Sequence, residues 1–117
     1  MAPDPEIDVA ALADLTEARG CCAEVGTLSL ALFRQGETVF ALENDCPHRG
    51  GPLCEGDVLA GVVYCPLHAW GFDLRTGHAT NVRRAKVAVF PARVQHGRVL
   101  VRVGAKASGD RAGDEGD

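Results

Sequence analysis

The most constraining feature of this chain is a pair of short cysteine–histidine clusters. The first cluster places Cys46 and His48 two positions apart, and the second places Cys65 and His68 three positions apart. Sixteen residues separate the two clusters. Each spacing puts one cysteine and one histidine at the tip of a single loop. A fold for this chain must therefore bring two loops face to face, so that four metal-binding side chains converge.

Thiolates and imidazoles in this pairing are typical of a two-iron, two-sulfur centre with unequal ends. We expect Cys46 and Cys65 to bind one iron as thiolates, and His48 and His68 to bind the other through one ring nitrogen each. Neutral nitrogen ligands raise the reduction potential above that of an all-thiolate cluster. The pattern therefore predicts a one-electron carrier, with metal ligands but no catalytic residues and no substrate turnover by this chain alone.

Zinc is the alternative metal, because it also accepts two cysteines and two histidines in tetrahedral geometry. Zinc fingers favour a cysteine pair followed by a histidine pair. Here cysteine and histidine alternate, which suits one of each from either loop, as a mixed cluster requires. A zinc-binding interaction module without a redox role is the reading that this order disfavours.

The rest of the chain consists of short β-rich runs separated by Gly, Asn and Asp, with little helical periodicity. Such a pattern predicts an all-β fold, an antiparallel sandwich or small barrel. Gly36 and the pair His96-Gly97 predict hairpin turns, and Ala11–Arg19 has room for one short helical turn. The expected strands are Ile7–Ala10, Cys22–Val25, Leu28–Arg34, Thr38–Glu43, Val62–Tyr64, Gly71–Asp73, Val87–Val89, Ala92–Gln95 and Arg98–Val103.

We expect a single domain over residues 1–103, because 117 residues suffice for one modest core. Between about residues 44 and 80, Gly, Pro, Cys and His concentrate and the strands shorten. This stretch is expected to form a cluster-binding lobe inserted in the sheet scaffold. Residues 104–117 are rich in Gly and Asp and nearly free of apolar residues, which predicts a disordered acidic tail.

Charge and hydropathy exclude several classes of partner. The net charge of −4 argues against nucleic acid and against an anionic membrane surface. No apolar run approaches the roughly twenty residues of a membrane span, and no signal peptide is visible, so we expect a cytoplasmic protein. Neither G-x-G-x-x-G nor a P-loop occurs, so we expect electrons to arrive from one protein and leave to another.

The remaining cysteines are expected to be structural. The chain has five cysteines, an odd number that fits a reducing compartment better than a disulfide framework. Cys21, Cys22 and Cys54 have no ligand partners in the pattern. We expect them to be thiols that serve packing.

The two clusters and their flanks resemble the two boxes of the Rieske [2Fe-2S] family. The residues that carry the resemblance are CPHRGGPL, from Cys46 to Leu53, and CPLHAWGFD, from Cys65 to Asp73. The similarity extends over Ile7–Val103. Within the family, the chain looks most similar to the small subunit of assimilatory NAD(P)H nitrite reductase. The single-domain ferredoxins that donate electrons to ring-hydroxylating dioxygenases or other oxygenases are the alternative.

The resemblance implies an all-β Rieske fold with one [2Fe-2S] cluster on the four ligands named above. It also implies redox protein partners, a flavin-containing reductase upstream and a terminal reductase or oxygenase downstream. Rieske proteins of cytochrome bc-type complexes carry an extra cysteine in each box, joined by a disulfide. Here Leu67 stands where one of them belongs, and Cys54 lies too far from Cys46 to be the other. The resemblance therefore implies no disulfide at the site and a potential toward the low end of the Rieske range.

Overall fold

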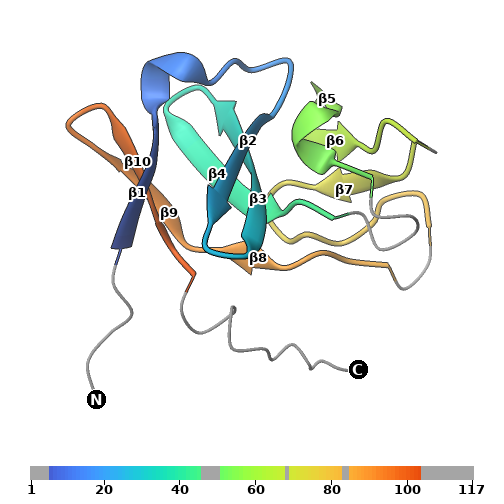
Figure 1. Cartoon of the computed structure of the whole chain (residues 1–117). Coiled ribbons are helices and arrows are strands. Elements are labelled where there is room, and N and C mark those ends of the chain that lie inside the picture. Colours follow the sequence, from blue (N-terminus) through green and yellow to red (C-terminus); the bar gives the residue numbers. More distant parts are fainter. Residues whose placement is uncertain (1–5, 46–50, 68, 83–84, 104–117) are drawn as a thin grey trace.

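The computed structural model describes residues 6–45, 51–67, 69–82 and 85–103, which form strands, turns and two short 3-10 helices (Figure 1). The elements in chain order are β1 (Glu6–Ala11), η1 (Leu12–Asp14), β2 (Cys21–Val25), β3 (Leu28–Gln35), β4 (Thr38–Glu43), η2 (Leu53–Glu55), β5 (Asp57–Leu59), β6 (Val62–Tyr64), β7 (Gly71–Asp73), β8 (Val89–Phe90), β9 (Ala92–Gln95) and β10 (Arg98–Arg102).

The strands form three antiparallel sheets. A terminal sheet has the order β1-β10-β9, a central sheet has the order β2-β3-β4-β8, and a small sheet has the order β5-β6-β7. In Figure 1 the terminal sheet lies at one side of the molecule and the small sheet at the other, with β2, β3 and β4 between them. The predicted antiparallel all-β fold is confirmed.

Two apolar cores flank the central sheet, and β3 contributes to both. The lobe core lies toward the small sheet and the scaffold core toward the terminal sheet. Ala31 and Phe33 point into the lobe core, whereas Leu30 and Leu32 point into the scaffold core. Successive side chains of a strand face opposite sides, so a continuous apolar run is what a strand buried on both faces requires. This strand fixes the small sheet to the rest of the protein.

Hairpin turns form where the sequence predicts them. Gly36 lies between β3 and β4 with a φ of +66°. His96 and Gly97 join β9 to β10 with φ values of +54° and +76°, as a two-residue turn with two left-handed positions requires. The alternation that follows places Val99 and Val101 in the scaffold core, both fully buried.

Two local expectations were wrong. Strand β5 was not expected; it pairs with β6 over three residues, too few for the alternation to be visible in sequence. Strand β8 covers Val89–Phe90 rather than Val87–Val89, because the Val87 N–H donates to Gly77 O instead of joining a ladder. The one short helical turn expected within Ala11–Arg19 is confirmed as the 3-10 helix η1.

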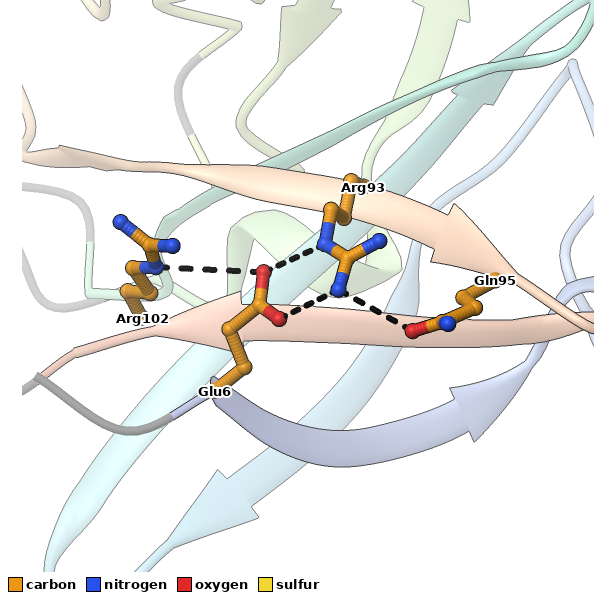
Figure 2. A network of polar contacts seen from close by, with 4 residues as sticks. All are labelled: Glu6, Arg93, Gln95 and Arg102. Atoms are coloured by element: carbon orange, nitrogen blue, oxygen red, sulfur yellow. Dashed lines mark hydrogen bonds and ion pairs between the residues drawn. The ribbon is translucent and has the colours of Figure 1, made fainter.

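A network of charges ties the first strand into the terminal sheet (Figure 2). Arg93 on β9 donates through Nε and Nη2 to the Glu6 carboxylate on β1, at 2.6 and 2.7 Å. Arg93 Nη2 also donates to Gln95 Oε1 at 3.0 Å, and Arg102 Nε lies 3.8 Å from Glu6 Oε2. Because β10 lies between β1 and β9, the network spans all three strands.

Replacing Glu6 by glutamine is expected to make the protein less stable above about pH 5. The Arg93 hydrogen bond lowers the pKa of Glu6 below its usual value. A carboxylate with a lowered folded-state pKa contributes stability above its unfolded pKa, about 4.3, and loses that contribution as pH falls through its folded pKa. The free energy of unfolding of wild type and Glu6→Gln should therefore converge in acid. Urea titrations at several pH values measure this, with Glu37→Gln in the β3–β4 turn as the charge-matched control. A pH-independent difference would contradict it.

Candidate metal centre

The two cysteine–histidine loops leave the central and the small sheet at neighbouring places. The first loop follows the end of β4 and leads to η2, and the second joins β6 to β7. Of the four expected ligands, Cys46, His48 and His68 lie outside the described residues. Cys65 is described: it follows β6 directly, is 3% exposed and belongs to the lobe core.

The end of the first loop lies against the second loop. A Cβ on Gly51 would lie 2.6 Å from Cys65 Sγ and 3.1 Å from Leu67 Cδ1. Only a residue without a side chain fits such an approach. A Cβ on Gly71 would meet Thr80 Oγ1 at 2.8 Å, so the end of the second loop is packed as closely.

The second loop is closed by hydrogen bonds around Cys65. The Cys65 N–H donates to Trp70 O at 2.8 Å, and the Ala69 N–H donates to Cys65 O at 2.9 Å. Ala69 takes a left-handed conformation, with a φ of +59°. Asn81 binds the two residues that flank Trp70 at the end of this loop. Its Oδ1 accepts from the Gly71 N–H at 2.9 Å, and its Nδ2 donates to Ala69 O at 3.0 Å.

The first loop is closed by another asparagine. Asn44 is 8% exposed and is the one buried polar residue among those that the structure describes. Its Oδ1 accepts from the Cys54 N–H at 2.8 Å, and its backbone oxygen accepts from the Leu53 N–H at 2.9 Å. Its Nδ2 donates to Ser29 Oγ at 2.9 Å. These bonds join β4, β3 and η2 at the place where the first loop begins and ends.

Sequence reasoning missed both asparagines. The only signal for Asn44 is its position at the end of an apolar strand, where asparagine often starts a turn. Asn81 lies ten residues after Gly71, and no local pattern links the two.

The expectation that Cys22 and Cys54 are thiols was wrong. The structure joins them in a disulfide with a Cα–Cα distance of 4.9 Å, although 32 positions separate them in sequence. Alternation along β2 explains the pairing, since Cys21 packs on the scaffold core and Cys22 therefore faces the opposite side, where Cys54 lies in the lobe core. Cys21 is a free thiol as expected, and burial raises its pKa, with a smaller contribution from Asp14.

The described part of the site fits a sulfur-bound metal centre. The Cys65 thiol is buried, and the backbone of the first loop approaches its Sγ so closely that no side chain could stand there. Thiolate ligands in such a setting suit iron–sulfur clusters and zinc. The described geometry is compatible with either metal centre, and the choice between the two depends on the family.

Comparison with known proteins makes that choice. Residues 7–102 match the family model for the Rieske-like [2Fe-2S] domain. The chain belongs to this family. The Rieske-like domain covers nearly all of the described residues, and membership of the family implies a Rieske-type [2Fe-2S] cluster as the cofactor. The chain is thus a Rieske-type electron-transfer ferredoxin.

Relatives include proteins from two kinds of redox system. The anthranilate 1,2-dioxygenase ferredoxin subunit of Burkholderia cepacia is 37% identical over 95 residues, which cover 80% of this chain and 88% of that protein. A ferredoxin in a complex of reduced oxygenase and oxidized ferredoxin in carbazole 1,9a-dioxygenase has a TM-score of 0.73 and 30% identity, covering 81% of this chain and 99% of that one.

The second kind is represented by a putative NADH-dependent nitrite reductase small subunit from Mycobacterium tuberculosis. It has a TM-score of 0.78 and 28% identity, covering 86% of this chain and 96% of that one. The Rieske ferredoxin fold is therefore common to both kinds of relative. Within the described residues, no helix has the length and apolar character needed to cross a bilayer.

Proposed function

We propose that this ferredoxin carries single electrons from a flavin-containing reductase to the terminal component of an oxygenase system. In this proposal Cys46 and Cys65 bind one iron of the cluster, and His48 and His68 bind the other. The observation that carries the proposal is the 37% identity, over most of both chains, to the ferredoxin subunit of a dioxygenase. The bound cluster supplies reversible one-electron transfer at a potential above that of all-thiolate clusters.

Two described residues support this role, one because it is buried and the other because it is exposed. Cys65 is buried behind the backbone of Gly51, which keeps water from the sulfur side of the site. In contrast, Leu67, the residue before His68, is 53% exposed. A histidine beside an exposed apolar residue is a suitable exit for an electron, because a partner that covers Leu67 comes close to the imidazole.

A second candidate is the small subunit of an assimilatory NAD(P)H nitrite reductase. The observation that favours it is the likeness to the Mycobacterium tuberculosis protein, with a TM-score of 0.78 at 28% identity. In that case the chain would bind stably to a large subunit containing sirohaem and flavin. The two candidates differ in whether the chain acts as a free carrier or as part of a permanent complex.

The test uses the purified protein with an oxygenase-type flavin reductase and a terminal oxygenase component. We expect red-brown protein with two irons and two acid-labile sulfides, rapid reduction by the reductase, and reoxidation by the oxygenase in stopped-flow mixing. Failure to exchange electrons, combined with co-purification with a sirohaem-containing subunit, would favour the nitrite reductase role. Colourless protein with stoichiometric zinc would contradict both.

Replacing Leu67 by serine is expected to slow electron transfer to the oxygenase about tenfold, because burial of a leucine side chain by a partner contributes about 1.5 kcal/mol to binding, which is about tenfold in affinity. The matched control is Leu59→Ser. Leu59 is 70% exposed but lies at the β5–β6 turn, about 10 Å along the hairpin from Cys65. Stopped-flow rate constants at several oxygenase concentrations separate weaker binding from slower transfer. Equal effects of the two substitutions would show that Leu67 is not part of the interface.

A further inference from the structure

The two ligand-bearing loops share a device: each is closed by one asparagine side chain acting as acceptor and donor at once. Asn44 accepts from the Cys54 N–H and donates to Ser29 Oγ, at 2.8 and 2.9 Å. Asn81 accepts from the Gly71 N–H and donates to Ala69 O, at 2.9 and 3.0 Å. We call each of these pairs of side-chain hydrogen bonds a clasp. The Asn44 clasp lies where the first loop begins and ends, and the Asn81 clasp lies where the second loop ends.

The Asn44 clasp joins the two ends of the first loop. Besides the side-chain bond to Cys54, the Asn44 backbone oxygen accepts from the Leu53 N–H, and its N–H donates to Ser29 O at 3.0 Å. Asp45 and Pro52 form a bridge immediately inside the clasp. The described residues on either side of positions 46–50 are thus bonded to each other through Asn44, which is itself bonded to β3, a strand that is buried on both faces. Displacement of Asn44 would release both ends together.

The Asn81 clasp holds the outgoing end of the second loop. Asn81 reaches from a different part of the chain and binds Ala69 and Gly71, on either side of Trp70, whose oxygen accepts from the Cys65 N–H. The clasp is therefore one hydrogen bond removed from Cys65. An amide is the side chain that fits, because the position needs an acceptor for one N–H and a donor for one carbonyl, which a carboxylate cannot provide.

We propose that Asn44 and Asn81 are positioning residues of the metal centre. They set the separation and orientation of the two loops, and through them the geometry of the cluster ligands. This inference rests on the ligand assignment of the proposed function. Neither asparagine touches the cluster in this proposal; each acts through the backbone of its loop, as the outer partners that orient metal ligands do.

The test compares the cluster-loaded wild type with Asn44→Ala, Asn44→Asp and Asn81→Ala. We measure the rate at which iron is lost to a chelator, the electron paramagnetic resonance spectrum of the reduced cluster, and its midpoint potential. Loss of either clasp is expected to speed iron loss about tenfold or more and to shift the spectrum and the potential. Asn44→Asp should fall between wild type and Asn44→Ala, because its carboxylate still accepts from the Cys54 N–H.

Gln35→Ala is the matched control, since it removes an amide at the other end of β3 whose Nε2 donates to Glu17 O at 3.2 Å and to Arg34 O at 2.8 Å. It should retain the wild-type spectrum. Ser29→Ala removes the partner of Asn44 Nδ2 but leaves the bond to Cys54, so it should fall between wild type and Asn44→Ala. If Asn44→Ala and Asn81→Ala lower only the resistance to urea, with spectrum, potential and iron loss as in wild type, the clasps are merely structural and the proposal is overturned. Should Asn44→Ala not fold, Asn81→Ala decides the question, because Asn81 is exposed and its side-chain hydrogen bonds to described residues are those with Gly71 and Ala69 of the second loop. If the purified wild-type protein contains no iron and no sulfide, the ligand assignment of the proposed function is overturned as well. That result is obtained from the wild type alone, so it is distinguishable from a failure of the proposal about the asparagines.

Discussion

Replacing Gly51 by alanine is expected to prevent cluster assembly while the terminal and central sheets still fold. The added Cβ would lie 2.6 Å from Cys65 Sγ, closer than carbon and sulfur can approach, and 3.1 Å from two atoms of Leu67. The Leu67 side chain is exposed and can rotate away, but Cys65 is buried and its sulfur has nowhere to go. The first loop must therefore move away from the second, which separates the proposed ligands.

Iron and acid-labile sulfide per chain, together with the visible absorption, measure this effect. We expect at least about a tenfold loss of cluster content in Gly51→Ala. The control is Gly36→Ala: a Cβ at Gly36 meets nothing within 4 Å, but its φ of +66° disfavours a side chain. That variant should lose about 1 kcal/mol of stability and keep its full cluster. A fully loaded Gly51→Ala variant with the wild-type potential would show that the two loops do not need this contact.

The fold could be predicted from sequence where the physical cause is local. Alternating side chains and left-handed turn positions are properties of neighbouring residues, so the strand Thr38–Glu43 and the turn at His96-Gly97 were located correctly. Spacing also predicted two loops with a cysteine and a histidine each; of these four residues the structure describes Cys65, which follows β6. Strand β5 was missed because three residues carry no readable alternation, and pairing with β6 is what makes them a strand.

The features of the site that were missed depend on contacts between distant residues. Asn44 reaches the Cys54 N–H across the whole first loop, and Asn81 reaches Gly71 from ten residues away. The disulfide depends on which face of β2 a cysteine occupies and on where η2 packs, neither of which the spacing of cysteines reveals. An odd number of cysteines favoured free thiols, yet one pair can form whenever two of the five are brought together.

Replacing Cys22 by serine is expected to lower the free energy of unfolding of the oxidised protein by about 3 kcal/mol. The disulfide closes a loop over a sequence separation of 32 and links β2, an edge strand, to η2 at the end of the first ligand loop. Cross-linking such a loop restricts the unfolded chain and so favours the folded state. Urea unfolding before and after reduction with a phosphine measures the contribution.

Reduction should lower the stability of wild type to that of Cys22→Ser and leave the variant almost unchanged. Cys21→Ser is the matched control, because Cys21 lies on the same strand, is half-buried and carries a free thiol; its stability should still respond to reduction as wild type does. Thiol titration of the unfolded, cluster-free and unreduced wild type should find three thiols rather than five. Five thiols, with no effect of the reductant on stability, would show that Cys22 and Cys54 are not joined.

Reduction of the disulfide should also speed iron loss from the cluster-loaded protein. The Cys54 N–H donates to Asn44 Oδ1, so the disulfide and the end of the first loop are held by the same residue.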